Sequence, residues 1–180
     1  MTDIISSKYI YEGHIINLRL DKINLGPGNK EKRLREVVEH NAAVAIVPID
    51  DHENILFVRQ YRHPTKEHLL EVPAGIIEKG EHPADTAIRE LQEEIGYASG
   101  NLRPLGGFWS SPGFTDEYIH CFKATNLVMS KLPEDEDEDI TIETIHKSKI
   151  AKLIRLGETQ DAKTIAILMM SECVLSLIHI

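Results

Sequence analysis

The sequence predicts a mixed α/β domain that is preceded by a small β-rich extension. From residue 41 onward, short apolar runs of strand type are interrupted by segments whose apolar residues recur at helical spacing. Residues 4–39 contain only extended patterns, separated by the strong turn "GPGNK". These two observations place an N-terminal β extension in residues 1–40 and the main domain in residues 41–180.

Strands are expected both in the N-terminal extension and in the first part of the main domain. In the extension, "IISSKYIYEG" and "HIINLRLDKINL" alternate loosely between apolar and polar residues, and "EKRLREVVEH" resumes extended structure after the turn. The main domain begins with two buried-strand candidates, "AAVAIVPID" and "NILFVRQYR", which the polar turn "DHE" joins. A shorter strand, "HLLEVPAG", ends at a Pro-Ala-Gly turn.

A helix is expected from Pro83 to Ile95. A proline near the first position and a glycine, Gly96, just past the end are typical of helix termini. The apolar residues of this segment share one stripe that must face the core. They are Ala84, Ala87, Ile88, Leu91 and Ile95.

Two further strands, "LRPLGGFW" and "EYIHCFKATNL", are expected after this helix, on either side of the loop "SSPGFTD". The acidic run "PEDEDED" then precedes a short strand, "ITIETI". Two helical segments, "KSKIAKLIRLGE" and "DAKTIAILMMSECVLSLI", close the chain.

Composition excludes several classes of function. The formal net charge is −9 and no cluster of lysine and arginine marks a nucleic-acid surface, so no nucleic-acid partner is expected. The two cysteines lie far apart, which argues against a disulfide framework. No secretory signal pattern is visible, and the most apolar stretch, "TIAILMMSECVLSLIHI", is too short and too polar to span a membrane. We therefore expect a cytoplasmic protein without a membrane partner.

Three glutamates near the C-terminus of the expected helix are its most unusual feature. Glu90, Glu93 and Glu94 lie where the helix dipole is negative, which disfavours each carboxylate by roughly 0.3–1 kcal/mol. Glu90 and Glu94 are also a like-charge pair one turn apart. Either solvent screens this acidic face or a cation binds there. Carboxylates at this spacing suit Mg²⁺, which prefers oxygen ligands.

Residues 75–97, "GIIEKGEHPADTAIRELQEEIGY", match the motif G-x5-E-x7-R-E-U-x-E-E-x-G-U, where U is a bulky apolar residue. Its fixed positions are Gly75, Glu81, Arg89, Glu90, Glu93, Glu94 and Gly96. In this stretch the chain resembles the Nudix hydrolase superfamily, with Tyr97 as a mild departure where an aliphatic residue is commoner. The resemblance implies a Nudix-type α/β/α sandwich with a mixed sheet. It also implies metal-dependent hydrolysis of a nucleoside diphosphate linked to another group.

The same resemblance implies a metal site. In the family, carboxylates of this motif and the backbone carbonyl just before its first glycine bind the metal. Carried over to this chain, the ligands are Ala74, Glu90 and Glu94, with Glu93 as a secondary or bridging ligand. The implied cofactor is Mg²⁺, with Mn²⁺ as the alternative.

Most of the chain from residue 41 onward resembles one branch of the superfamily, the ADP-ribose pyrophosphatases. "SSPGFTDE" places Pro112, a candidate substrate-binding residue, fifteen positions after Tyr97. "VRQYR" and "LLEVPAG" match the approach to the motif, and "GETQDAKTIAIL" resembles a helix start of that branch. The implied activity is hydrolysis of ADP-ribose to AMP and ribose 5-phosphate. Two alternatives stay open: hydrolysis of another nucleotide sugar, such as GDP-mannose or ADP-glucose, and non-catalytic sensing of ADP-ribose.

The branch also implies individual roles. Arg62 corresponds to the arginine that contacts the substrate diphosphate, against the alternative of a surface arginine at a strand end. Arg35 is a weaker candidate for the same pocket, and Glu117 matches a glutamate near the ribose and the metals. The acidic run corresponds to a mobile loop with a catalytic glutamate. On that loop the general base is Glu138 or Glu136, with Glu138 preferred.

A homodimer is expected as well. Residues 4–39 form strands with exposed edges, and soluble proteins generally cover such edges. The resemblance implies that this sheet is swapped between subunits. Tyr9, Tyr11 and Arg35 are then expected to reach the partner's adenine site, although tyrosines in strands more often serve packing.

Overall fold

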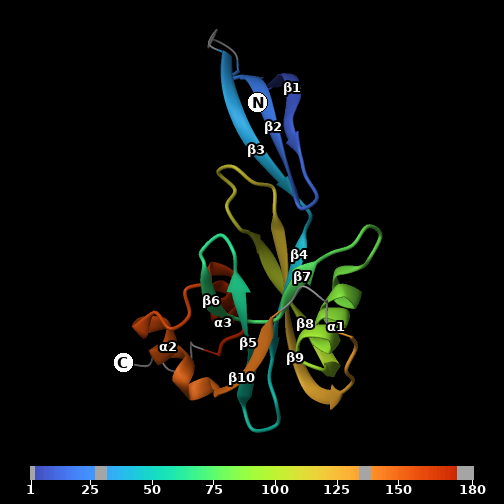
Figure 1. Ribbon diagram of the computed structural model, residues 1–180, viewed down its shortest axis with the longest axis vertical. Coiled ribbons are helices and arrows are strands. Elements are labelled where there is room, and N and C mark those ends of the chain that lie inside the picture. Colours follow the sequence, from blue (N-terminus) through green and yellow to red (C-terminus); the bar gives the residue numbers. More distant parts are fainter. Residues whose placement is uncertain (1–2, 27–31, 134–138, 174–180) are drawn as a thin grey trace. The chain divides into compact units, whose positions relative to one another are not determined.

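The computed structural model describes residues 3–26, 32–133 and 139–173 (Figure 1). The chain divides into two units. The first unit is Met1–Ala42 with Phe108–Tyr118, and the second is Ala43–Gly107 with Ile119–Ile180. The assignment of residues 1–40 to dimerisation stays a prediction.

The first unit contains an antiparallel sheet in the order β1-β2-β3. Its strands are β1 (Asp3–Glu12), β2 (Ile16–Asn24) and β3 (Lys32–His40). A polar network links all three strands. Arg19 on β2 pairs with Asp21, at 2.9 Å from Nε to Oδ1, and with Glu39 on β3. The hydroxyl of Tyr9 on β1 donates to the same Glu39 carboxylate at 3.4 Å.

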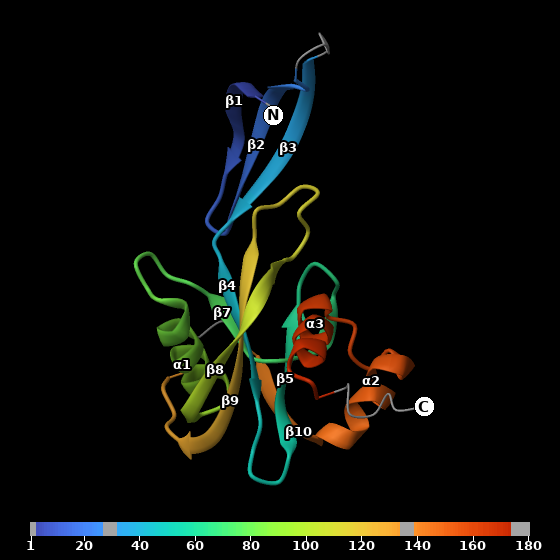
Figure 2. The same cartoon turned by 180° about the vertical axis from the view of Figure 1, so that it is seen from behind.

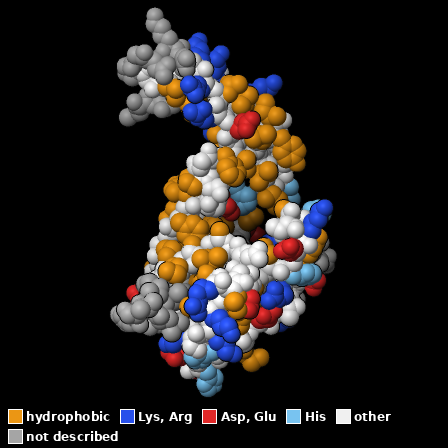
Figure 3. Space-filling view, turned by 90° about the vertical axis from the view of Figure 1, so that its left-hand side faces the viewer, with side chains coloured by type: hydrophobic (Ala, Val, Ile, Leu, Met, Phe, Trp, Pro, Cys, Tyr) orange, Lys and Arg blue, Asp and Glu red, His pale blue; other side chains and the backbone are white. Residues whose placement is uncertain are grey.

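Apolar side chains lie exposed on this small sheet (Figure 3). Every residue of β1 is exposed. The exposed apolar residues of the sheet and its turns include Ile4, Ile5, Ile10, Tyr11, Ile15 and Leu34. A sheet of three strands that buries so little apolar surface is expected to need a covering partner.

The second unit contains two sheets. A mixed sheet has the order β7-β4-β9-β8, in which β4 pairs antiparallel with β7 and parallel with β9. Its strands are β4 (Ala43–Pro48), β7 (Ala74–Ile76), β8 (Tyr97–Trp109) and β9 (Tyr118–Met129). An antiparallel sheet has the order β10-β5-β6, with β5 (Asn54–Arg62), β6 (Glu67–Glu71) and β10 (Ile140–His146).

Helices cover both sides of these strands. Helix α1 (Pro83–Glu94) lies on one side, and α2 (Ile150–Leu156) and α3 (Ala162–Met170) lie on the other, as Figures 1 and 2 show. A single 3₁₀ turn, η1 (Lys147–Lys149), leads into α2. Both α1 and α3 contact β4. The second unit is therefore an α/β/α arrangement with a mixed sheet, as the sequence predicted.

The core joins α1 to both sheets. The buried cluster consists of Val44, Ile46, Leu56, Val58, Ala87, Leu91, Ile95, Phe122 and Ala124. Three of the five residues of the predicted apolar stripe, Ala87, Leu91 and Ile95, are in this cluster, and Ala84 packs against it. The helical periodicity of this segment therefore identified the buried face correctly.

Local sequence explains where α1 begins and ends. The His82 side chain accepts a hydrogen bond from the Ala84 N–H at 3.2 Å, and Pro83 follows as the first helical residue. Gly96, with φ of 75°, lies just beyond the Ile95 cap, where a left-handed backbone favours glycine. No helix in the described part of the chain is long and apolar enough to cross a membrane.

Candidate active site

Arg89 lies at the centre of the charged cluster on α1. Its Nε donates to Glu81 Oε1 at 3.1 Å and its Nη1 to Glu93 Oε2 at 2.7 Å. Its Nη2 donates to the Ile76 carbonyl oxygen at 3.3 Å. Burial opposes the charge of Arg89, but the hydrogen bonds to Glu81 and Glu93 and the field of Glu90 raise its pKa above the usual value. Arg89 therefore fixes the 76–81 loop against the helix.

The two glutamates that were predicted to bind metal are buried. Glu90 is 8% exposed and Glu94 is 4% exposed, which rejects the alternative of a solvent-screened acidic face for this pair. Glu94 Oε2 accepts a hydrogen bond from the Ala74 N–H at 3.1 Å. The pair therefore lies against β7, the strand that leads into the motif.

Gly75 makes this close approach possible. A Cβ atom at this position would lie 1.8 Å from Glu90 Oε1 and 2.4 Å from Glu90 Oε2. Only a residue without a side chain leaves the Glu90 carboxylate in its place. The glycine of the motif is thus explained by close packing at the acidic pair.

This arrangement fits a divalent cation of the Mg²⁺ type. Among residues 3–26, 32–133 and 139–173, no three His, Cys, Asp or Glu side chains converge as a ready metal site. Mg²⁺ does not require three, because it is usually held by one or two carboxylates together with substrate phosphates and waters. Glu90 and Glu94 can supply those carboxylates. Arg89 Nη1 pairs with Glu93 Oε2 at 2.7 Å and with Glu90 Oε1 at 2.8 Å, and the role of Glu93 as a metal ligand stays a prediction.

Arg62 at the end of β5 is held by a residue that sequence analysis missed. Its Nε and Nη2 donate to the two oxygens of Glu71 at 2.8 and 2.7 Å. The hydrogen bond to Glu71 raises the pKa of Arg62, and the charge of Glu94 contributes in the same direction. The charge of Glu94 therefore acts on Arg62. The only signal for Glu71 in the sequence was a charged residue directly after "HLL" in a strand of buried type.

Other predicted site residues lie in the first unit. Glu117 Oε1 lies 3.6 Å from Nδ1 of His40, and the Glu117 carbonyl accepts from the Ser110 N–H at 3.1 Å. Pro112 lies in the loop between Ser110 and Glu117. Arg35 on β3 is exposed and donates to the Leu34 carbonyl at 3.0 Å. Their roles stay predictions.

The two candidate bases, Glu136 and Glu138, lie outside the described residues.

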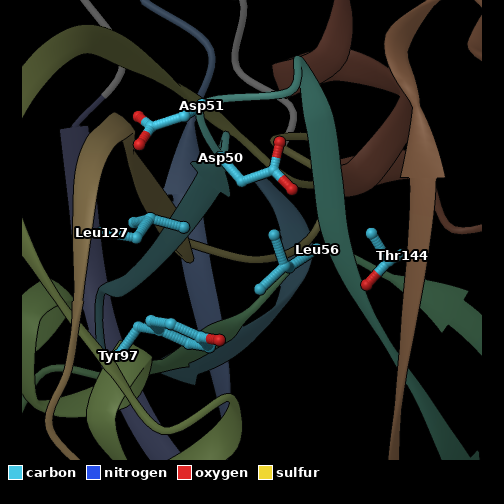
Figure 4. Close-up of a pocket in the computed structure, with 6 residues that line it drawn as sticks. All are labelled: Asp50, Asp51, Leu56, Tyr97, Leu127 and Thr144. Atoms are coloured by element: carbon cyan, nitrogen blue, oxygen red, sulfur yellow. The ribbon is translucent and has the colours of Figure 1, made fainter.

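Described residues of the second unit line cavities at more than one place. One, of about 160 Å³, is lined by Asp50, Asp51, Leu56, Tyr97, Leu127 and Thr144 (Figure 4). Its carboxylate Asp50 accepts hydrogen bonds from the N–H groups of His52 and Asn54, both at 2.8 Å. These bonds close the turn between β4 and β5, so we assign Asp50 a structural role.

Another cavity, of about 280 Å³, lies beside Glu94. Glu94 lies in its wall together with Ile95, Gly96, Tyr97, Met129, Lys131 and Ile142. This is an open space beside one of the predicted metal ligands.

Known proteins resemble the chain over most of its length. It is 39% identical over 162 residues to the ADP-ribose pyrophosphatase of Bacillus subtilis (strain 168), covering 89% of this chain and 86% of that protein. It is 37% identical to the methanol dehydrogenase activator of Bacillus methanolicus, covering 89% and 87%. It is 30% identical to the GDP-mannose pyrophosphatase of Yersinia enterocolitica serotype O:8 / biotype 1B, covering 78% of each.

The fold has a close counterpart among solved structures. The crystal structure of an ADP compounds hydrolase superposes with a TM-score of 0.87, covering 99% of this chain and 97% of that one at 22% identity. This likeness confirms the predicted fold. The sequence model of the NUDIX domain matches residues 39–166, which is most of the chain. With the motif, the fold and these relatives in agreement, the protein belongs to the Nudix domain family.

Proposed function

We propose that the protein hydrolyses the diphosphate bond of ADP-ribose to give AMP and ribose 5-phosphate, with Mg²⁺ or Mn²⁺ as cofactor. The observation that carries the proposal is the pair of carboxylates, Glu90 and Glu94, buried against β7. The substrate class is supported by the 39% identity to an ADP-ribose pyrophosphatase over most of both chains.

The proposed site residues act by binding the cation and the charged diphosphate in fixed positions. Glu90, Glu94 and the Ala74 carbonyl would hold the divalent cation, which supplies neutralisation of the diphosphate and activation of water. Arg62 binds the diphosphate, since a guanidinium can grip phosphate oxygens bidentately. Arg89 keeps the motif loop and α1 together.

A general base completes the reaction. Water attacks one phosphorus atom, the bond from that phosphorus to the bridging oxygen breaks, and the bridging oxygen leaves with the other phosphate. The proton of the attacking water goes to Glu138 or Glu136 of the acidic run. In the ADP-ribose pyrophosphatases that the chain resembles, a mobile loop carries the catalytic glutamate, which suits a base that approaches the water when substrate is bound.

Another nucleotide sugar is the second candidate substrate. The 30% identity to a GDP-mannose pyrophosphatase supports it, but the 39% identity to the ADP-ribose enzyme favours ADP-ribose. A non-catalytic sensor is disfavoured by the intact motif, in which two neighbouring carboxylates, Glu90 and Glu94, are buried where a divalent cation would further compensate their charge.

A panel of diphosphates tests the proposal. ADP-ribose, GDP-mannose, ADP-glucose and NAD⁺ are incubated with the protein and Mg²⁺ or Mn²⁺, and nucleoside monophosphate release is measured by chromatography. We expect the highest kcat/KM for ADP-ribose and no release in EDTA. A higher value for GDP-mannose would establish the second candidate instead, and no release from any compound would support the sensor.

We further propose that the protein is a cytoplasmic homodimer formed through the first unit. The exposed apolar side chains of β1, such as Ile4, Ile10 and Tyr11, are the surface that a second copy would cover. Both cysteines, Cys121 and Cys173, are buried and free, which agrees with a reducing compartment.

Light scattering tests the dimer. We expect a dimeric mass at micromolar concentration for the full chain and a monomeric mass after deletion of residues 1–38, because the deletion removes the exposed apolar strands. Tyr11→Ser and Ile10→Ser together provide a milder disruption that leaves the second unit intact. A monomer of the full chain at micromolar concentration would refute the proposal.

A further inference from the structure

Glu71 is a buried carboxylate to which the proposed reaction gives no role. It is 1% exposed and lies at the end of β6, three residues before Ala74. A carboxylate this deeply buried costs free energy unless its partners compensate the charge. The residues that bind the Glu71 carboxylate and hold its backbone therefore indicate its role.

One partner is Arg62, whose guanidinium binds Glu71 through the edge formed by Nε and Nη2. The bonds from Nε and Nη2 engage both carboxylate oxygens, so the guanidinium plane is fixed. The remaining nitrogen, Nη1, takes no part in this pair and keeps two N–H groups for another acceptor. The Arg62 side chain is 38% exposed, whereas Glu71 is 1% exposed. Arg62 thus extends from a buried anchor toward solvent.

The backbone on both sides of Glu71 is fixed by residues around the start of α3. The hydroxyl of Thr159 donates to the Leu70 carbonyl at 2.9 Å, and the Val72 N–H donates to the hydroxyl of Thr164 at 2.9 Å. Both threonines are buried. The two residues flanking Glu71 in the chain are therefore each locked by a side chain, which defines the position of the carboxylate.

A second cation keeps this carboxylate charged. Lys163 bonds to Glu71 and also to Asp161, whose Oδ2 lies 3.1 Å from Nζ. Burial by itself would raise the pKa of Glu71, but the hydrogen bonds and charges of Arg62 and Lys163 lower it below the usual value. Glu71 is thus an anion that can hold Arg62 at neutral pH.

We propose that Glu71 is a positioning residue, which clamps one edge of Arg62 so that Nη1 is presented to the substrate diphosphate. A cation fixed before binding loses little side-chain entropy when it meets phosphate, which lowers the dissociation constant. The inference rests on the proposed function, because it takes a diphosphate as the ligand of Arg62. The competing explanation is that Glu71 only ties α3 to β6 through Lys163.

A double-mutant cycle separates the two explanations. Glu71→Gln keeps the shape and removes the charge, and Glu71→Asp keeps the charge but shortens the reach. Each change is made in the native chain and in Arg62→Ala. The dissociation constant of the non-hydrolysable α,β-methylene analogue of ADP-ribose is measured with Mg²⁺ by calorimetry, alongside KM, kcat and melting temperature.

If Glu71 positions Arg62, either Glu71 change raises the dissociation constant and KM about tenfold in the native chain and less than about twofold in Arg62→Ala, because the two residues act as one unit. A purely structural role predicts the same effect in both backgrounds. Should Glu71→Gln fail to fold, Glu71→Asp carries the same comparison.

Glu143→Gln is the matched control. Glu143 on β10 pairs with Arg59 on β5, so the same chemical change breaks an arginine–carboxylate pair on the same sheet. We expect KM within about twofold of the native value. Equal effects of the Glu71 changes in both backgrounds, or unchanged ligand affinity in the native chain, would overturn the inference. The absence of ADP-ribose hydrolysis by the native protein would instead refute the proposed function.

Discussion

Glu94→Gln is expected to lower kcat by at least about 100-fold while the protein stays folded. Glutamine keeps the volume of this 4% exposed side chain, and its amide oxygen can still accept from the Ala74 N–H. What it removes is the negative charge that a divalent cation requires. The measurement is kcat for ADP-ribose at saturating Mg²⁺, with circular dichroism as the test of folding.

Melting temperature provides an independent readout of the same site. Glu90 and Glu94 repel each other in the metal-free protein, so Mg²⁺ binding is expected to raise the melting temperature of the native chain. The rise is expected to shrink in Glu94→Gln. Glu53→Gln, at an exposed carboxylate paired with Lys147, is the control and should retain both the activity and the rise. A folded Glu94→Gln protein with near-native kcat would contradict the metal assignment.

Gly75→Ala is expected to reduce kcat by about 100-fold, a loss of the size that an ångström-scale displacement near reacting groups can cause. The added Cβ would lie 1.8 Å from Glu90 Oε1, and the Glu90 carboxylate must move to make room. The displaced group is the far end of a flexible side chain, so we expect the fold to survive. The kinetic assay with ADP-ribose and a thermal melt separate these two effects.

Gly100→Ala is the matched control for this steric change. Its Cβ would lie 3.1 Å from the Asn126 backbone oxygen and 3.1 Å from the Asn126 Cβ, between β8 and β9. We expect a lower melting temperature but a kcat within about twofold of native, because the strain falls outside the motif. If Gly75→Ala keeps native kcat, or if both changes reduce kcat alike, the close approach of Gly75 to Glu90 is not what activity requires.

Much of the second unit was predictable from local patterns. The apolar residues of α1 recur at helical spacing, and Ala87, Leu91 and Ile95 are indeed buried. Pro83 and Gly96 marked the two ends of this helix. Such features depend on residues within one or two helical turns of each other, so the local amino-acid sequence is sufficient to predict them. The motif spacing likewise identified the family, which the NUDIX match confirms.

The family resemblance ranked Glu90 and Glu94 above Glu93 as metal ligands, and the tertiary structure shows how the surroundings of the three glutamates differ. Arg89 pairs with both Glu90 and Glu93, but Glu90 and Glu94 are buried against β7 whereas Glu93 is partly exposed. Helical spacing places all three near one another but cannot tell which of them meets another strand.

By itself, the sequence determined most elements of the main domain, the buried face of α1 and the family, but the single strand expected over "HLLEVPAG" is two strands, β6 and β7, in different sheets. Only the tertiary structure decided that Glu71 would meet Arg62, nine residues earlier, and Lys163, 92 residues later. Periodicity encodes which face of an element is apolar, because that pattern repeats within the element. The partners of a single buried charge depend on how separate elements pack, and no local repeat in the chain records that packing.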